Sequence, residues 1–301
     1  MHKTVKGYLF VIISAVVYGC MPLGAKIIYA EGVNSMSLVL YRNLLSIPIM
    51  AALVKLQGDT LRITGKEAVK ISALSMLGAC ITPLLIYNAY RYVSSGAVTT
   101  MHFIYPAVVV LGGMLFLKEK APISSLICVG LCTLGVCLFY SPSEAMDPFG
   151  CALALFSGVT YAAYILLLPR SGLKTMSGFK LSMYMSLACS MVMFPVCLFS
   201  GSLTAPVSLK GWIACLLFSL ALCMGAVYLF QQGAFLIGSQ RASILSTFEP
   251  ITSLVVGVAF LQERLSPYAV FGAVLIVTAS IGISMSDLIR AREKHHHPHT
   301  K

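Results

Sequence analysis

The sequence predicts an all-α integral membrane protein with ten transmembrane helices, arranged as two inverted five-helix repeats. Three observations lead to this prediction. Of the 301 residues, 58% are hydrophobic and only 10% are charged, whereas soluble domains carry about 25% charged residues. Apolar segments of about 20 residues, long enough to cross a hydrocarbon core of about 30 Å, follow one another with short connections. The second half of the chain also repeats the pattern of the first half.

Ten apolar segments account for most of the chain, and no soluble domain is inserted between them. The expected helices lie at residues 7–28, 36–56, 70–90, 94–117, 123–140, 149–169, 180–200, 211–236, 241–262 and 267–286. They define two predicted domains, residues 7–140 and residues 149–286, which are followed by a cytoplasmic tail at residues 287–301.

The two halves share residues in a nearly constant register. Identical residues stand 144 positions apart at Ser95/Ser239, Pro106/Pro250, Gly113/Gly257, Phe116/Phe260, Leu117/Leu261 and Glu119/Glu263. Near the start of each half the offset is 143, at Gly7/Gly150, Ser14/Ser157 and Tyr18/Tyr161. Shared apolar residues are common between membrane segments, but a proline, a glycine and a terminal glutamate in one register indicate an internal repeat. Because five spans is an odd number, the second copy enters the membrane upside down.

The distribution of positive charge predicts the orientation. With the N-terminus inside, most Lys and Arg residues face the cytoplasm, and the outer loops hold only Arg91, Lys210 and Arg264. Both termini are therefore expected to be cytoplasmic, in a multi-pass protein of the cell (plasma or inner) membrane. The same bias explains the net charge of +11. Without a basic face or a binding motif, no nucleic-acid partner is expected.

Neither a metal nor a cofactor is expected. The ten cysteines lie mostly within apolar spans and form no CxxC pair, so we interpret them as packing residues. The His-rich stretch at residues 295–299 is interpreted as a disordered end rather than a metal site. No HExxH motif, phosphate loop or Ser/His/Asp set is present, which argues against an enzyme.

At this point the residues resemble a known family. The Pro-containing helices that end in Glu119 and Glu263, and in particular Phe248-Glu249-Pro250, resemble the EamA repeat of the drug/metabolite transporter superfamily. Arg42 resembles the arginine of the family's second helix. The resemblance covers residues 7–286 and implies ten helices, a central cavity and alternating access. The family commonly has Trp where this chain has Tyr18, so a substrate is not carried over.

The mid-span prolines, Pro106 and Pro250, are expected to kink their helices. Proline removes one backbone donor and leaves the carbonyl four residues earlier without its partner. These carbonyls belong to His102 and Ser246. Because an unpaired carbonyl is costly in hydrocarbon, the kinks are expected to face protein or a watery cavity. They serve as hinges or ligand contacts, or they only shape helix packing.

Three ionisable side chains are candidate site residues. Glu249 stands about eight residues into its helix, where an ionised carboxylate is costly unless it is paired, hydrated or protonated. It either couples protons and contacts the substrate, or holds its helix in place as a protonated acid. His102 is a proton relay, a substrate contact or a packing residue. Arg42 needs a partner or water within the membrane.

Aromatic and amide side chains are expected to line the same cavity. They are Tyr18, Tyr87, Asn88, Tyr105, Tyr161, Tyr228, Gln231 and Gln232. The amides orient a solute or clamp neighbouring helices. A lining with few fixed charges suits compact neutral or zwitterionic solutes, such as amino acids or nucleobase-like metabolites, and disfavours nucleotide sugars.

The sequence therefore predicts a secondary transporter that exports small organic metabolites by alternating access, coupled to protons. An uncoupled facilitator, and a non-transporting membrane enzyme or receptor on the same scaffold, stay open as alternatives. The expected partners are the metabolite, protons and the lipid bilayer, and the expected assembly is a monomer or a homodimer.

Overall fold

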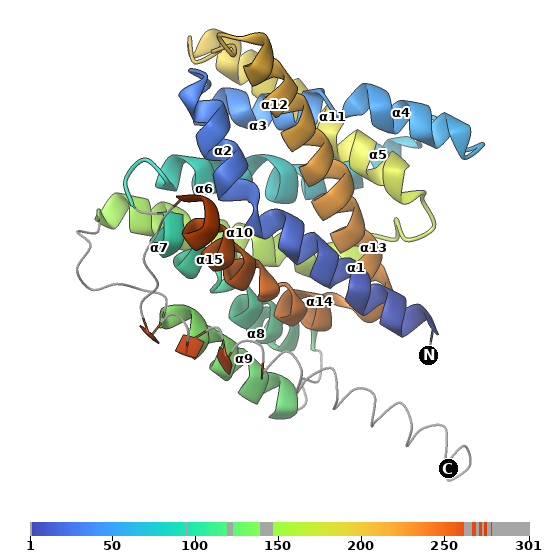
Figure 1. Ribbon diagram of the computed structural model, residues 1–301. Helices are drawn as coiled ribbons and strands as arrows, with labels where there is room; N and C mark the ends of the chain where they lie inside the picture. Colours follow the sequence, from blue (N-terminus) through green and yellow to red (C-terminus); the bar gives the residue numbers. More distant parts are fainter. Residues whose placement is uncertain are drawn as a thin grey trace, which may run out of the picture.

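The computed structural model describes residues 2–93, 95–118, 123–138 and 147–261, with scattered positions between 267 and 278. Over these residues the chain consists of helices joined by short turns, and the helices pack into one bundle (Figure 1). The protein is thus an all-α membrane protein, as its composition predicts.

Seven helical stretches within the described residues are long and apolar enough to cross a membrane. They are Thr4–Ala30, Ser35–Leu56, Gly65–Ala89, Pro148–Arg170, Gly178–Phe199, Leu209–Ile237 and Ser239–Phe260. The expected span 94–117 is divided into α7 (Ser95–His102) and α8 (Tyr105–Leu117). The expected span 123–140 forms α9 (Ile123–Cys137), which is only about 22 Å long at 1.5 Å per residue. The tenth lies mostly outside the described residues, so ten crossing helices are not confirmed.

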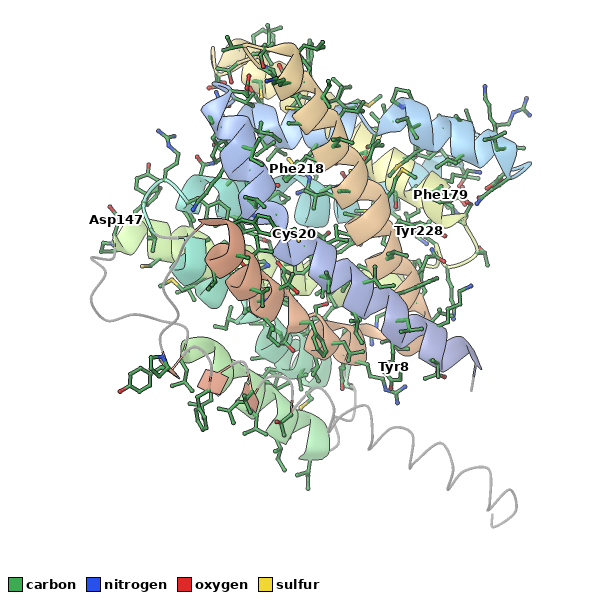
Figure 2. The ribbon with its side chains drawn as sticks, in the orientation of Figure 1. Tyr8, Cys20, Asp147, Phe179, Phe218 and Tyr228 are labelled. Carbon is green, nitrogen blue, oxygen red and sulfur yellow. The ribbon has the colours of Figure 1, made fainter. Side chains whose placement is uncertain are left out.

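Four of the expected spans are broken just before a proline. The broken pairs are α1 (His2–Gly19) with α2 (Met21–Ala30), α3 (Ser35–Leu44) with α4 (Ile47–Leu56), α7 with α8, and α14 (Ser239–Leu245) with α15 (Phe248–Leu261). The prolines Pro22, Pro48, Pro106 and Pro250 fall in the first turn of the second helix, where a missing N–H is harmless and the fixed φ suits a helix. Cys20 marks the first break, between α1 and α2 (Figure 2).

The break before Pro250 corrects one prediction. The carbonyl of Ser246 is not left unpaired, because it accepts a hydrogen bond of 2.9 Å from the backbone N–H of Glu249. The chain leaves the α-helix before the proline, and a tighter turn supplies a donor one residue earlier. The carbonyl of His102 faces protein as predicted, since a Cβ built at Gly158 of α10 (Pro148–Leu167) would lie 2.6 Å from its oxygen.

The third and eighth expected spans each contain a π-helical stretch. In the first half η1 (Met76–Ile81) lies between α5 (Gly65–Ser75) and α6 (Thr82–Ala89). In the second half η3 (Ala221–Tyr228) lies between α12 (Leu209–Leu220) and α13 (Leu229–Ile237). Shifting η1 by the repeat offset places it on η3. The repeat therefore extends to departures from α-helical geometry, which often mark functional sites.

Packing follows the repeat as well. The first helix of each half, α1 or α10, packs along the third span of the other half, α13 or α6. A Cβ on Gly7 would lie 2.6 Å from Ile237 and 3.0 Å from Leu236, and a Cβ on Gly150 would lie 2.6 Å from both Val93 and Tyr92. These partners are themselves 144 positions apart. Glycine is needed at both crossings because the helices approach too closely for a side chain.

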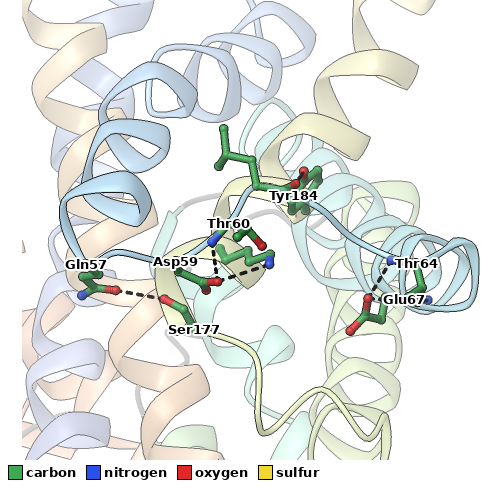
Figure 3. A network of polar contacts seen from close by, with 9 residues as sticks. Gln57, Asp59, Thr60, Thr64, Glu67, Ser177 and Tyr184 are labelled. Carbon is green, nitrogen blue, oxygen red and sulfur yellow. Dashed lines mark hydrogen bonds and ion pairs between the residues drawn. The ribbon is translucent and has the colours of Figure 1, made fainter.

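The second span of the first half is tied to α11 (Gly178–Phe199) of the second half at both ends. At one end Lys180 forms an ion pair of 3.5 Å with Asp59, and Ser177 donates a 3.0 Å hydrogen bond to Gln57 (Figure 3). The Tyr184 hydroxyl donates to the carbonyl of Leu61 in the same network. We call this set of contacts the 59–180 latch.

Hydrogen bonds join the opposite ends of these helices. Asn34 donates to the carbonyl of Ser202 at 2.5 Å, and the Tyr41 hydroxyl donates to the carbonyl of Thr204 at 2.9 Å. Such contacts hold the pair together along its length.

Candidate functional site

A small cavity lies where helices of the two halves meet. Its lining residues are Tyr18, Met21, Arg42, Thr82, Pro83, Ile86, His102, Tyr161 and Glu249. The structure thus brings together five of the residues that the sequence singled out, from both halves of the chain. The free space between them is about 30 Å³, which is room for one or two water molecules. Sites for small molecules are typically ten times larger, so in this conformation the space is too small to hold a metabolite.

Glu249 occupies the first turn of α15, and only 8% of its surface is exposed. A helix N-terminus favours a carboxylate there. Among the described residues, no side chain donates a hydrogen bond to the carboxyl group or pairs with it as a cation. The helices α1 and α15 touch at this point, since a Cβ on Gly19 would lie 2.7 Å from the Glu249 carbonyl oxygen. Glu249 is therefore held on a tightly packed crossing with its acid group turned to the cavity.

His102 ends α7 at the break, and the tautomer of its neutral ring follows from its partners. Its Nδ1 lies 2.8 Å from the Ser157 hydroxyl oxygen, which also lies 2.5 Å from the carbonyl oxygen of Ala154. A carbonyl can only accept, so the single hydroxyl proton of Ser157 is directed to Ala154. Nδ1 must then be the donor to Ser157. In the neutral ring Nε2 is therefore an acceptor.

Arg42 of α3 is almost wholly buried, with 2% of its surface exposed. Its Nη1 donates a 3.2 Å hydrogen bond to the Tyr87 hydroxyl, while Nε has no partner. No carboxylate of the described residues lies within ion-pair distance. The backbone is anchored separately, because its carbonyl accepts from Ser219 at 2.5 Å and from Cys223 at 3.1 Å. A buried cation with a neutral partner and an unused donor is costly unless a ligand or water satisfies it.

Aromatic rings surround the acid and the imidazole. The ring centre of Tyr161 lies 5.4 Å from that of His102 and 5.0 Å from that of Tyr105. Further rings continue the cluster, with Tyr164 at 5.8 Å and Phe230 at 5.9 Å from Tyr161. Of these rings, Tyr161 and His102 line the cavity, and an aromatic ring there presents a flat apolar face and π electrons to a solute or its cationic group.

The predicted amides lie outside the cavity lining. Asn88 accepts a 3.3 Å hydrogen bond from Ser35 and donates to the carbonyl of Leu84 at 2.8 Å. Gln231 accepts from Ser182 at 2.8 Å and donates to the Tyr164 hydroxyl at 3.3 Å. Both therefore join neighbouring helices, which is one of the two roles foreseen for them.

Two other candidates lie against the start of α11. A Cβ on Gly178 would lie 2.4 Å from the Gln232 amide nitrogen. Tyr228 stacks on Phe179 with ring centres 4.3 Å apart (Figure 2). A contact of these residues with solute stays a prediction.

Sequence reasoning missed four lining residues, Met21, Thr82, Pro83 and Ile86, and it also missed Ser157, the partner of His102. Ser157 had a signal, because it is the repeat partner of Ser14, whose hydroxyl donates to the carbonyl of Ala226 at 2.8 Å. Thr82 and Pro83 directly follow the π-helical stretch, and no pattern of apolar residues announces such a stretch. The terminal acids Glu119 and Glu263 and the stretch 295–299 lie outside the described residues.

Comparison with known proteins gives consistent matches. The model of the EamA-like transporter family matches residues 5–141 and 148–285. An uncharacterized inner membrane transporter, YicL, of Salmonella typhimurium is 24% identical over 97% of this chain and 99% of its own length. An uncharacterized transporter of Synechocystis is 26% identical over 83% of this chain and 79% of its own.

Two further matches extend this picture. Protein PecM of Dickeya dadantii is 24% identical over 82% of this chain and 86% of its own length. A crystal structure of a protein shares the fold with a TM-score of 0.76 at 14% identity, over 93% of this chain and 97% of that one.

Proposed function

The chain belongs to the EamA-like transporter family, whose model matches both of its halves, and from this premise we propose that it is a proton-coupled secondary transporter of small organic metabolites. Membrane transport, and not an enzymatic reaction, is the activity of that family. The observation that carries the proposal is Glu249, a buried acid that lines a small cavity between the two halves and has no partner among the described side chains.

The proposed architecture is two inverted repeats of five helices, residues 7–140 and 149–286, with both termini in the cytoplasm. The matched packing of Gly7 and Gly150 supports a common plan for the two halves. The excess of Lys and Arg in the predicted inner segments supports the orientation. A cell-membrane location is supported by the relative that is named an inner membrane transporter.

The coupling step follows from the cost of a buried charge. An ionised Glu249 in this small cavity would have no cation within ion-pair distance among the described residues. This state therefore favours either a protonated carboxyl group or a carboxylate that is paired with a cationic group of the solute. Proton and solute thus compete for one side chain, which produces exchange: protons enter as the solute leaves. Alternating access then requires that the cavity opens to one side of the membrane at a time.

The lining also limits the solute. One arginine and one acid face the cavity together with aromatic rings, so a compact neutral or zwitterionic molecule is favoured over a polyanion. Amino acids and nucleobase-like metabolites fit this description. Tyr18 and Tyr161 of the lining are the proposed apolar and hydrogen-bonding surface, supported by Tyr87 against Arg42 and by Tyr105 against Tyr161. Pro106 and Pro250 are the proposed hinge points.

The experiment is transport by the purified chain in liposomes. A panel of amino acids and nucleobases is offered with and without an imposed pH gradient, and protein-free liposomes serve as the control. Gradient-driven accumulation of a panel member supports the proposal. Flux that does not depend on the pH gradient would indicate an uncoupled facilitator. The absence of flux for every panel member would favour a non-transporting role.

A further inference from the structure

The second span of the first half touches α11 at both ends, and α11 packs along both α3 and α4 in between. The contacts at one end are the 59–180 latch (Figure 3). The contacts at the other end link residues 34–41 to residues 202–204, and we call them the 37–202 latch. In the 37–202 latch the Ser37 hydroxyl donates to the carbonyl of Ser202 at 3.0 Å, and the Tyr41 hydroxyl donates to the carbonyl of Thr204 at 2.9 Å.

The tyrosines of the two latches are equivalent in the repeat. Tyr41 and Tyr184 stand 143 positions apart. The residues whose carbonyls accept their hydrogen bonds, Thr204 and Leu61, also stand 143 positions apart. This is the offset that relates the first helices of the two halves. Because the halves are expected to be inverted, the repeat places the same tyrosine contact near each face of the membrane.

A second pair of contacts is equivalent in position but differs in chemistry. Ser37 corresponds to Lys180 and Ser202 corresponds to Asp59, again at an offset of 143. A hydrogen bond from a hydroxyl to a carbonyl at one end is thus replaced by an ion pair of 3.5 Å at the other. The Asp59 side chain is 33% exposed, so dissolved salt can screen this ion pair. The 37–202 contacts between neutral groups lack this sensitivity.

The latches separate more easily than the glycine crossings between the halves. At Gly7 and Gly150 an added Cβ would meet neighbours at 2.6 Å, and helices packed this closely lose their van der Waals contacts when they part. Hydrogen bonds and exposed ion pairs near a membrane surface are exchanged for bonds to water at small net cost. With both latches formed, the free space in the cavity is only about 30 Å³.

We propose that the two latches are the two gates of the transport cycle. The 59–180 latch parts to open the cavity to the cytoplasm, and the 37–202 latch parts to open it to the outside. While one latch is open, the other stays formed and serves as the pivot. This inference rests on the proposed alternating access and names the contacts that alternate. The ion pair of Asp59 with Lys180 makes the cytoplasmic gate the salt-sensitive one.

The test is the labelling of a cavity cysteine, which requires no solute. Thr82→Cys, in a background without native cysteines, places a thiol on the cavity lining at a position that is only 3% exposed. A small charged methanethiosulfonate, which does not cross membranes, is applied to right-side-out and to inside-out vesicles. The labelling rate from each side then reports how often the gate on that side opens. If Thr82→Cys fails to fold, Ile86→Cys provides a second lining position.

Matched variants remove one hydroxyl from each gate. Tyr184→Phe should raise the labelling rate from the cytoplasmic side by about two- to tenfold, as expected for the loss of one hydrogen bond, and should not raise the rate from the outside. Tyr41→Phe should have the opposite effect. Tyr92→Phe, at an exposed tyrosine, is the control and should change neither rate. A rise from both sides in each variant, as general loosening would produce, would overturn the proposal, and so would the reversed pattern.

Ionic strength tests the difference between the gates. Raising the salt concentration from about 50 mM to about 500 mM should increase the labelling rate from the cytoplasmic side and leave the rate from the outside unchanged. Asp59→Asn should raise the cytoplasmic rate at low salt and remove its dependence on salt. This variant also controls for any effect of salt on the reagent. A salt response that persists in Asp59→Asn would overturn the role of the ion pair.

The gates and the transport function fail differently. Labelling of the cavity cysteine from both sides, at rates that no latch variant changes, would refute the gates and leave alternating access intact. The absence of labelling from either side in every variant would refute both. Flux in liposomes, measured separately, decides transport whatever the labelling shows.

Discussion

The hydroxyl of Ser157 lies 2.8 Å from Nδ1 of His102 and fixes which nitrogen of that ring carries the proton. This relationship joins the first helix of the second half to the break in the fourth span of the first half. It leaves Nε2 as the acceptor of the neutral ring, and it makes the imidazole testable with two amides that each mimic one ring nitrogen.

His102→Gln should retain more transport than His102→Asn. The Gln oxygen can reach the position of Nε2 and accept a hydrogen bond there, whereas the Asn amide can replace only the Nδ1 donor to Ser157. Loss of one hydrogen bond corresponds to about 0.5–1.5 kcal/mol, so we expect the Asn variant to be about three- to tenfold poorer in apparent affinity. Uptake assays at several solute concentrations measure this, and the reverse ranking would contradict the tautomer.

Glu249→Gln should abolish accumulation driven by a pH gradient while exchange of solute for solute persists. The amide keeps the shape but cannot release a proton or carry a negative charge. Transport by the unmodified chain should rise with the imposed proton gradient, and transport by the variant should not respond to it. Glu249→Asp, which keeps the titratable group, is the matched control and should remain gradient-driven. Unchanged proton-driven flux in the Gln variant would leave the residue with a structural role only.

Gly7→Ala and Gly150→Ala should each destabilise the protein by about 1–3 kcal/mol, because the new methyl group meets neighbours at 2.6 Å in a packed crossing. Gly130→Ala is the control. A Cβ there would meet nothing within 4 Å, and alanine is the better helix former. Thermal unfolding in detergent reports the differences. Equal melting temperatures for all three variants would show that the two crossings are loose.

The stability that the 59–180 latch provides should depend on the opposite charges of Asp59 and Lys180. Asp59→Asn or Lys180→Met alone should lower stability by about 1–3 kcal/mol, since one partner is buried and the other is partly exposed. The exchanged pair, Asp59→Lys with Lys180→Asp, should recover part of the loss. If the exchanged pair is worse than the sum of the single variants, the attraction between the two charges is not what holds this end together.

The orientation can be checked by thiol labelling in a background without native cysteines. A cysteine at exposed Val207 should react with an impermeant reagent applied to intact cells. A cysteine at Thr175, exposed at the other end of the bundle, should react only after the cells are opened. Labelling of the Thr175 variant from outside would exclude inverted repeats with cytoplasmic termini.

The repeat was the most informative feature of the sequence because it predicted two halves built on one plan, and the matched glycine crossings follow the same register. The shared prolines located the breaks at α7–α8 and α14–α15 to within a few residues. Their detailed geometry was not predictable. Proline chemistry alone suggested an unpaired carbonyl at Ser246. The turn that gives this carbonyl a donor forms because the chain leaves the α-helix before the proline.

The candidate site was predicted through its ionisable and aromatic members. Glu249, His102 and Arg42 stood out because charged groups are rare within apolar spans, and the structure places them on one cavity. Asn88 and Gln231 hydrogen-bond to neighbouring helices, which is one of the two roles that the sequence left open for them. Which face a side chain takes within a membrane span depends on packing, and apolar periodicity is weak where both faces are apolar.

The crossing of α1 with α13 has a consequence for biosynthesis. About 210 residues separate the end of α1 from the start of its partner, so at about 5–20 residues per second α1 is made roughly 10–40 s before α13 exists. Until then, the face of α1 that carries Gly7 is covered only by lipid or by the insertion machinery. Likewise, α6 is synthesised before its partner α10, which belongs to the second half of the chain. Neither half can reach its native packing alone, and assembly must follow insertion of both halves. Synthesis that stops in the second half would therefore leave an inserted but unassembled chain. Quality-control proteases can recognise such a chain by the helix surface that its missing partner would have covered.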